Sequence, residues 1–231
     1  MRELTLILDD LRGEIVVEDN QDLSAEAVKH LEENLGEAQS IACARPLQII
    51  EPPADSFKKE TDEISVRVAG FYHNSLTEGP GRRSSVLFQF CPLKCLGCYV
   101  PELHDKNAGV SVPVKKLAAS LLDPQHERDG VTILGGEPFA QILGLRALIQ
   151  ELRKSGCPHI VCYSGYTLEA LSEKAVKQSA IGEVLDEIDI LIDGAYVESQ
   201  AAGAGLWTGS GNQRVIDMRA TNQNSRVILY S

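Results

Sequence analysis

Residues 85–98 read Ser-Val-Leu-Phe-Gln-Phe-Cys-Pro-Leu-Lys-Cys-Leu-Gly-Cys, so an apolar run passes directly into three closely spaced cysteines. The run over 85–90 predicts a β-strand, and Cys91, Cys95 and Cys98 then lie on a loop at its carboxyl end. A compact loop lets three thiolates converge on the irons of a cubane cluster, whose usual ligands are thiolates. Three protein ligands leave one iron open to another molecule, much as an open zinc position binds water. The spacing therefore predicts a reactive 4Fe-4S cluster.

Two other interpretations of the cysteine loop stay open at this point. One is a structural zinc site that takes a fourth ligand such as His104 or Cys162, and the other is a set of three core cysteines. Zinc sites usually contain paired C-x-x-C units, so the spacing favours the cluster. Cys43, Cys157 and Cys162 are scattered through apolar or turn sequences, and we expect them to be buried as small hydrophobic residues.

Outward from this loop, predicted strands alternate with predicted helices, which is typical of βα units with a parallel sheet. The expected strands are 85–90, 130–134, 159–163 and 188–192, with two less regular ones near 214–218 and 226–230. The expected helices are 113–122, 139–154 and 167–178. Such units are too few for a closed eight-stranded barrel, so we predict an α/β fold that forms a partial, open TIM-like βα barrel. Its chemistry should lie at the carboxyl ends of the strands.

The residues before this region predict a smaller unit. Runs at 3–8 and 14–18 indicate a hairpin, a capped amphipathic helix follows from Ser24 to Leu35, and a strand near 46–50 would complete a ββαβ arrangement. Two prolines and many charges then indicate a linker. We therefore divide the chain into an N-terminal α+β unit over 1–50, a linker over 51–63 and a cluster-binding domain over 64–231.

The composition is that of an ordinary globular protein, with 231 residues, 43% hydrophobic residues and 24% charged residues. The formal net charge of −11 repels phosphates, so nucleic acid is not an expected partner. No stretch approaches the ~18 apolar residues of a membrane span, and no basic start precedes an apolar run. We expect a cytoplasmic protein whose cysteines stay reduced.

Several motifs together resemble one known superfamily. The stretch Cys91-Pro-Leu-Lys-Cys95-Leu-Gly-Cys98-Tyr99 resembles the signature of the radical S-adenosylmethionine enzymes. Asn74-Ser-Leu-Thr-Glu-Gly-Pro-Gly-Arg82 resembles the segment before the cluster loop in glycyl-radical-enzyme activases, and Gly135-Gly136-Glu137-Pro138 follows at a fitting distance. Three further stretches are similar to landmarks of the anaerobic ribonucleotide reductase activating family, in the same order: Tyr163-Ser164-Gly165-Tyr166, Ile192-Asp193-Gly194 and Gly209-Ser-Gly-Asn-Gln-Arg214.

This resemblance implies a site for S-adenosylmethionine beside the cluster. Gly135, Gly136 and the Glu137 carboxylate would receive the ammonium of its methionyl part, and Tyr99 would pack beside the cluster. Ser164 and Asp193 each end a predicted strand, where a side chain can point toward the ribose or the carboxylate. Both could equally be turn residues.

The segment Gly209–Arg214 has two interpretations of its own. It could be a substrate-facing loop in which Arg214 pairs with an anion, or it could be a solvated hairpin turn.

The resemblance also implies an activity. A reduced 4Fe-4S cluster would cleave S-adenosylmethionine to a 5'-deoxyadenosyl radical, which takes hydrogen from a glycine of a partner glycyl-radical enzyme. A flavodoxin-like or ferredoxin-like donor would supply the electron. Two alternatives are a radical enzyme acting on a peptide or small molecule, and a non-catalytic iron-sulfur or zinc protein.

Overall fold

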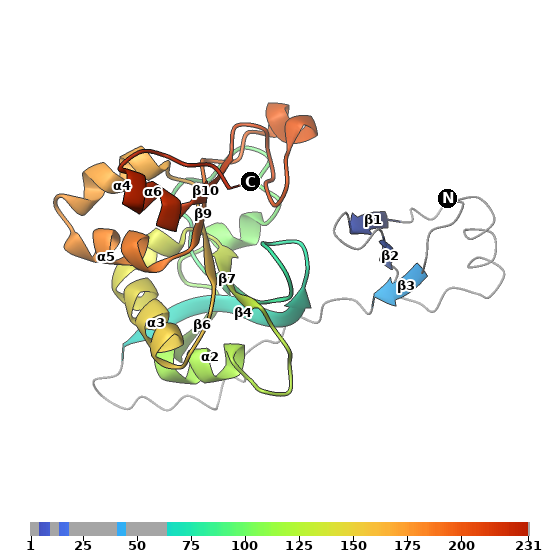
Figure 1. Cartoon of the computed structure of the whole chain (residues 1–231), viewed down its shortest axis with the longest axis horizontal. Coiled ribbons are helices and arrows are strands. Elements are labelled where there is room, and N and C mark those ends of the chain that lie inside the picture. Colours follow the sequence, from blue (N-terminus) through green and yellow to red (C-terminus); the bar gives the residue numbers. More distant parts are fainter. Residues whose placement is uncertain (1–4, 10–13, 19–40, 45–63, 231) are drawn as a thin grey trace. The chain divides into compact units, whose positions relative to one another are not determined.

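A computed structural model of the chain describes residues 5–9, 14–18, 41–44 and 64–230 (Figure 1). The chain divides into two compact units, Met1–Gln48 and Ile49–Ser231. Within the described residues, no helix is long and apolar enough to cross a membrane.

The first unit contains a three-stranded sheet in the order β1-β2-β3. Strand β1 (Thr5–Asp9) pairs antiparallel with β2 (Glu14–Glu18), which confirms the predicted hairpin. Strand β3 (Ile41–Ala44) pairs parallel with β2 and was not predicted. The helix expected over 24–35 and the strand expected near 46–50 lie outside the described residues.

The second unit is built on a seven-stranded sheet in the order β10-β9-β8-β7-β5-β4-β6 (Figure 1). Its four central strands, β5, β7, β8 and β9, are parallel, and antiparallel strands border them on both sides. The strands are β4 (Ser65–Ser75), β5 (Arg83–Phe88), β6 (Val110–Pro113), β7 (Gly130–Gly135), β8 (Ile160–Ser164), β9 (Ile190–Asp193) and β10 (Arg214–Asp217). The α/β class is confirmed, and the partial barrel stays a prediction.

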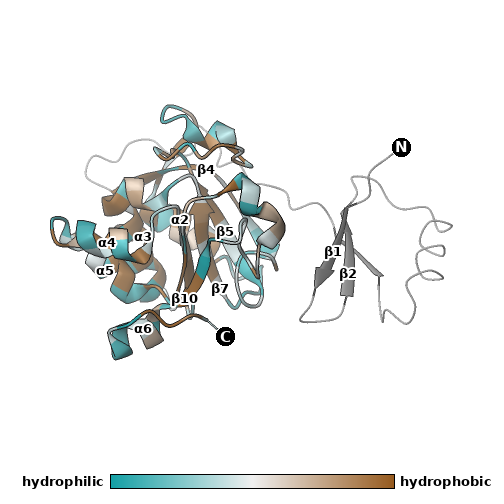
Figure 2. Ribbon diagram, turned by 90° about the horizontal axis from the view of Figure 1, so that it is seen from above, coloured by the Kyte–Doolittle hydropathy of each residue, from teal (hydrophilic) through white to brown (hydrophobic). Residues whose placement is uncertain are grey.

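The α-helices lie together along one side of this sheet (Figure 1). They are α2 (Val114–Leu121), α3 (Ile142–Lys154), α4 (Leu168–Ala175), α5 (Ser179–Glu187) and α6 (Met218–Asn224). Among the described residues, three short 3-10 helices lie in loops: η1 (Pro101–His104), η2 (Pro138–Gln141) and η3 (Glu198–Gly203). Figure 2 shows that the strands are largely hydrophobic, whereas the helices carry hydrophilic residues as well.

Alternation along the strands divides the apolar side chains between the two faces of the sheet. Val131 and Ile133 of β7 belong to the main core with the helices, whereas Val161 of β8 belongs to a smaller cluster with Ile190 and Ile192. Tyr163, Trp207 and Val215 pack against that smaller cluster. Because successive side chains of a strand point to opposite faces, the helices bury one face, and the loop residue Trp207 covers part of the other.

Helix α3 matches its prediction most closely. The five residues expected to share a face are all buried, namely Ile142, Leu145, Leu148, Ile149 and Leu152. Gly144 lets the helix approach β4, because a Cβ there would clash with Val66. The predicted start at 139 is wrong, since Pro138–Gln141 forms a separate 3-10 turn before α3 begins.

Several other expectations differ from the structure. Strand β10 pairs antiparallel with β9, so the run of parallel strands ends at β9. The strand expected near 226–230 is only an isolated bridge between Ile216 and Leu229. Strand β4 was missed because register shifts between Val68 and Gly70 and between Tyr72 and Ser75 break its alternation.

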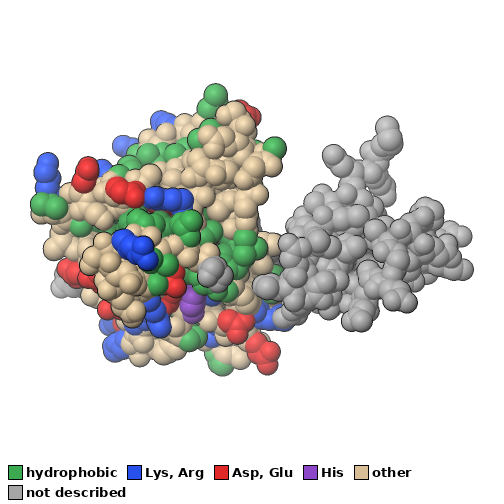
Figure 3. Space-filling model, turned by 45° about the horizontal axis from the view of Figure 1, so that its top comes forward, with side chains coloured by type: hydrophobic (Ala, Val, Ile, Leu, Met, Phe, Trp, Pro, Cys, Tyr) green, Lys and Arg blue, Asp and Glu red, His purple; other side chains and the backbone are tan. Residues whose placement is uncertain are grey.

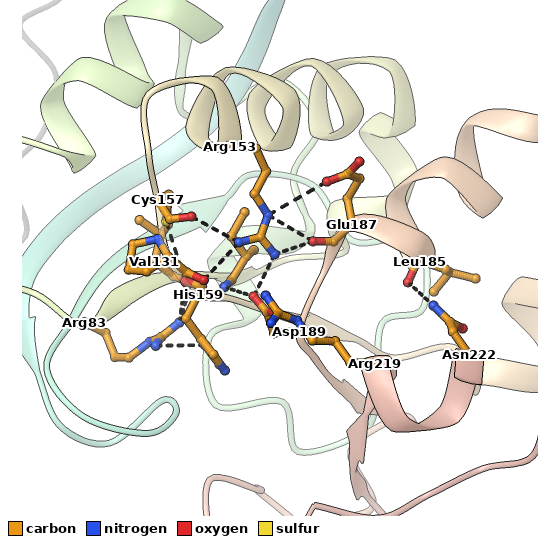
Figure 4. Close-up of polar contacts among 12 residues, drawn as sticks. Arg83, Val131, Arg153, Cys157, His159, Leu185, Glu187, Asp189, Arg219 and Asn222 are labelled. Atoms are coloured by element: carbon orange, nitrogen blue, oxygen red, sulfur yellow. Dashed lines mark hydrogen bonds and ion pairs between the residues drawn. The ribbon is translucent and has the colours of Figure 1, made fainter. Parts of the chain in front are cut away.

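A network of arginines ties the amino ends of the central strands together (Figure 4). Arg153 of α3 donates to Asp189 Oδ2 at 2.7 Å, to the Glu187 carbonyl at 2.5 Å and to the Cys157 carbonyl at 3.1 Å. Arg83 is completely buried and donates to the Val131 carbonyl at 2.6 Å. These bonds satisfy backbone acceptors at the end of the sheet away from the cysteine loop.

Charges of both signs share the face of the second unit drawn in Figure 3. Lysine and arginine side chains lie among acidic ones there, with hydrophobic patches between them. Such a mixed surface produces only a weak long-range field on that face.

Candidate functional site

One pocket brings the three cysteines of the loop together at the carboxyl ends of the central strands. Its cavity volume is about 130 Å³, and it opens to solvent at its mouth. The residues that line it come from the last residues of β7 and β8 and from the loops after β5, β7, β8 and β9: Cys91, Leu93, Cys95, Cys98, Val100, Leu103, His104, Gly135, Gly136, Tyr163, Ser164, Gly165, Gly194, Tyr196 and Gln213.

The cysteine loop is a strained turn. Phe90 and Lys94 have positive φ values of 77° and 48°, which are uncommon for residues with a side chain. Gly97, with φ of 70°, lies against Glu198, and a Cβ on it would come 2.5 Å from the carboxylate carbon. Strained backbone of this kind clusters at functional sites, and here it lies in the loop whose three thiols line the pocket.

All three loop cysteines are free thiols of intermediate exposure. Burial raises the pKa of Cys91, and the backbone N–H groups of Leu93 and Lys94 oppose that rise. Among the described residues, no three His, Cys, Asp or Glu side chains surround a single point where one metal ion could be held. Thiolates of a cubane each bind a different iron, so three thiols spread around one pocket fit a 4Fe-4S cluster.

Gly135 and Gly136 form the pocket edge next to the cysteines. The Gly136 N–H donates to the Phe88 carbonyl at 2.8 Å, and the Glu137 N–H donates to the Phe90 carbonyl at 2.9 Å. A Cβ on Gly135, whose φ is 108°, would lie 2.6 Å from the Phe88 nitrogen. Only glycine therefore allows β7 to approach the segment before Cys91 this closely.

The Glu137 carboxylate supports this edge from within the protein. Its side chain is completely buried and accepts hydrogen bonds from the Phe139 N–H at 3.0 Å, the Gly165 N–H at 2.8 Å and the Ser164 hydroxyl at 3.1 Å. Burial raises its pKa to about 7, and these hydrogen bonds oppose the rise. Glu137 does not line the pocket, unlike the two glycines before it.

The other residues predicted to bind the cofactor occupy three different places. Ser164 lines the pocket, and its hydroxyl also accepts the Tyr166 N–H at 3.0 Å. Asp193 is buried outside the pocket lining and accepts the Leu168 N–H at 2.7 Å. Tyr99 is 71% exposed, and its ring centroid lies 4.9 Å from that of Tyr196.

Arg214 pairs with anions of the protein itself. Its guanidinium donates to Asp193 Oδ1 at 3.0 Å and to Glu169 Oε2 at 2.7 Å. This pairing lowers the pKa of Glu169 to about 2 and raises that of Arg214. Arg214 thus joins β9 and β10 to helix α4.

Sequence reasoning missed several residues that line the pocket, including Tyr163, Tyr196 and Gln213. The Tyr163 hydroxyl donates to the Trp207 carbonyl at 2.7 Å. Tyr163 and Gln213 lie within stretches singled out by the resemblance, but nothing in a linear pattern tells which side chain of such a stretch faces inward. His104 also lines the pocket, and its Nε2 is buried without a hydrogen-bond partner among the described residues.

Comparison with known proteins agrees with this site. The family described as 4Fe-4S single cluster domain matches residues 77–216, which include the cysteine loop and the other strand ends that line the pocket. The fold and the thiol-lined pocket, with this match, define an iron-sulfur protein of the 4Fe-4S single-cluster class.

Sequence similarity to bacterial proteins identifies the family within this class. The chain is 30% identical over 161 residues to the anaerobic ribonucleoside-triphosphate reductase-activating protein of Salmonella typhimurium, covering 67% of this chain and 100% of that protein. It is 31% identical over 150 residues to the protein of the same name from Vibrio cholerae, covering 62% of this chain and 92% of that protein. A putative glycyl-radical enzyme activating enzyme of Haemophilus influenzae is 34% identical over 103 residues, covering 44% of this chain and 38% of that protein. The chain belongs to the family of anaerobic ribonucleoside-triphosphate reductase-activating proteins.

Proposed function

We propose that this protein binds a 4Fe-4S cluster through Cys91, Cys95 and Cys98 and uses it to cleave S-adenosylmethionine, activating a glycine of a partner glycyl-radical enzyme. The observation that carries the proposal is that three free thiols line the same pocket as the backbone of Gly135 and Gly136. The names of the bacterial relatives support the choice of partner, which would be an anaerobic ribonucleoside-triphosphate reductase.

When bound, a reduced cluster would supply the electron for cleavage of a carbon–sulfur bond of S-adenosylmethionine, yielding methionine and a 5'-deoxyadenosyl radical that takes hydrogen from the substrate. Cys91, Cys95 and Cys98 would hold the cluster, and the space beside them would receive the methionyl part of S-adenosylmethionine. Gly135 and Gly136 line the pocket and let the end of β7 lie against the segment before Cys91. Ser164 lines the same pocket at the end of β8 and would contact the ligand there.

We assign the remaining predicted residues to supporting roles. The Glu137 carboxylate holds the ends of β7 and β8 at a fixed separation through its bonds to Gly165 and Ser164. Asp193 anchors the start of helix α4 and pairs with Arg214. Tyr99 contacts Tyr196 at the rim, where both rings limit the access of water to the thiols.

We also propose roles for the two units of the chain, an electron donor and a cellular environment. Residues 64–231 would form the cluster-binding domain as a partial barrel, and residues 1–50 would serve as a docking module for the partner. A flavodoxin-like or ferredoxin-like protein would deliver the electron, and a reducing, cytoplasmic environment would preserve the thiols.

The first experiment tests cofactor chemistry. Anaerobically reconstituted protein should bind about four irons per chain and, with dithionite, release 5'-deoxyadenosine and methionine from S-adenosylmethionine. Cys91→Ala should lose both properties, whereas Cys157→Ala, which removes a thiol outside the pocket, should keep them. Binding of zinc in place of iron, or unchanged cleavage in Cys91→Ala, would refute the proposal.

The second experiment tests the substrate. After turnover with an anaerobic ribonucleoside-triphosphate reductase, electron paramagnetic resonance should show a persistent glycyl doublet on the partner. Cleavage of S-adenosylmethionine without that doublet, but with modification of a peptide or a small molecule, would replace the proposed partner and keep the cofactor chemistry. Deleting residues 1–62 should abolish the doublet and spare uncoupled cleavage if the first unit only docks the partner.

A further inference from the structure

The loop between β9 and β10, residues 194–213, is closed by side chains near its own end. Ser210, Asn212 and Gln213 lie in the polar stretch that precedes Arg214. We refer to these three residues as the clasp. Their hydrogen bonds join the end of the loop to its beginning.

Gln213 contributes the bonds nearest the pocket. Its Oε1 accepts the N–H groups of Gly209 at 2.7 Å and Ser210 at 3.2 Å, and its Nε2 donates to the Gly194 carbonyl at 2.8 Å. One carboxamide therefore bridges both ends of the loop. Gly194 has φ of 104°, so its backbone adopts a conformation that residues with a side chain rarely take.

Ser210 and Asn212 extend the clasp away from the pocket. The Ser210 side chain is completely buried, and its hydroxyl accepts the Val197 N–H at 3.1 Å and donates to Asn212 Oδ1 at 2.8 Å. Asn212 Nδ2 donates to the Ala195 carbonyl at 2.8 Å. A loop held by several side-chain bonds at both ends has little freedom to open.

This loop forms one wall of the candidate site. Gly194, Tyr196 and Gln213 line the pocket. The loop also touches the cysteine loop, because Tyr196 packs on Tyr99, and Glu198 leaves no room for a Cβ on Gly97. A shift of the loop would therefore change the shape of the space beside the thiols.

We propose that Gln213 is a positioning residue for S-adenosylmethionine: by holding Gly194 to Gly209 and Ser210, it fixes the wall that contains Tyr196 and so sets the affinity of the pocket. The identity of the ligand rests on the proposed function, whereas the closure of the loop does not depend on it.

Gln213→Ala tests this role against a matched control on the same loop. Gln200 is exposed, and its backbone carbonyl, which accepts the Gly211 N–H at 2.9 Å, is retained in Gln200→Ala. In cluster-free protein, amide exchange over 195–211 should be about five- to tenfold faster in Gln213→Ala than in wild type, because net loss of a hydrogen bond corresponds to such a factor. Gln200→Ala should exchange like wild type. Unchanged exchange in Gln213→Ala would overturn the proposal.

The reconstituted enzyme provides a second measurement. Half-saturation by S-adenosylmethionine should require about five- to tenfold more ligand in Gln213→Ala, with a smaller fall in kcat and an unchanged iron content. Gln213→Glu keeps the acceptor for Gly209 and Ser210 but loses the donor to Gly194, so exchange at those two amides should stay slow while affinity still falls. A parallel loss of kcat and iron with unchanged half-saturation would indicate a merely structural role and refute the positioning role.

The two proposals fail in different ways. Wild-type protein that binds no S-adenosylmethionine would refute the proposed function and the ligand named here. Amide exchange in the cluster-free protein would still decide whether Gln213 holds the loop.

Discussion

The Glu137 carboxylate accepts the Gly165 N–H at 2.8 Å, although Glu137 follows β7 and Gly165 follows β8. A buried acidic group thus joins the ends of two neighbouring strands directly beneath the candidate cofactor pocket. Burial favours the neutral form of Glu137, whereas the hydrogen-bond donors favour its charged form. Burial has the larger effect, so the pKa of Glu137 is raised.

The pH dependence of folding should report this group. The pKa of Glu137 is raised from 4.5 to about 7, so its contribution to stability is fully present below pH ~4.5 and is lost as the pH rises through about 7. The difference in unfolding free energy between wild type and Glu137→Gln should therefore change by about 3 kcal/mol across this range. Denaturant unfolding at a series of pH values measures this difference. The prediction is wrong if the unfolding free energies of wild type and Glu137→Gln change in parallel with pH.

Gly136→Ala should disturb the pocket edge. A Cβ there would clash with the Phe90 backbone, which cannot move without shifting Cys91. We expect a loss of about 2 kcal/mol or more in stability and a lower iron content after reconstitution. Gly182→Ala in α5 is the control, because its Cβ would meet only Ala175 at 3.8 Å and should stabilise the helix by about 0.5–1 kcal/mol. Full iron loading of Gly136→Ala would argue against a rigid edge.

Gly165 and Leu93 should show strong coupling. A Cβ on Gly165 would clash with the end of the Leu93 side chain, which lines the pocket from the cysteine loop. Gly165→Ala alone should destabilise the protein, and adding Leu93→Ala should recover part of the loss. A double-mutant cycle on thermal unfolding should give a coupling energy of about 1 kcal/mol or more, and strict additivity would show that the two residues do not meet.

Arg153→Ala should lower stability without affecting the cofactor site. It removes the bonds to Asp189, which is only 4% exposed, and to the Glu187 and Cys157 carbonyls. We expect a loss of about 2–3 kcal/mol with unchanged iron content. Arg146→Ala, which breaks an exposed pair with Glu183 at 3.3 Å, should cost about 1 kcal/mol at most. Equal losses in the two variants would show that burial of the Arg153 network is unimportant.

The sequence predicts the central βα units well because each strand is a short apolar run and each helix has a continuous apolar face. Ile160–Ser164 and Ile190–Asp193 are observed within a residue or two of their expected ends. Helix α5 was missed because the linear pattern does not separate it from α4, which ends at Ala175 only four residues before Ser179. The bulges of β4 and the antiparallel course of β10 depend on pairing between strands, which no single segment encodes.

At the candidate site, the cysteine pattern predicts which thiols lie together. It does not predict which groups the surrounding side chains contact. Gly135, Gly136 and Ser164 reach the pocket as expected. Asp193 ends β9 and Glu137 follows β7, as predicted, yet both accept backbone N–H groups inside the protein. A carboxylate at the end of a strand can accept hydrogen bonds from a ligand or from a neighbouring backbone N–H group. Which of these donors is closer depends on the fold and not on the local sequence.

The bridge between Ile216 and Leu229 has a consequence for self-association. The Tyr230 N–H donates to the Val215 carbonyl at 2.9 Å, and the Asp217 N–H donates to the Ile228 carbonyl at 2.9 Å, so residues 228–230 occupy hydrogen-bonding positions at the outer margin of β10. Exposed margins of sheets recruit strands from other molecules. Residues 228–230 therefore occupy backbone groups of β10 that a strand of another copy could otherwise pair with.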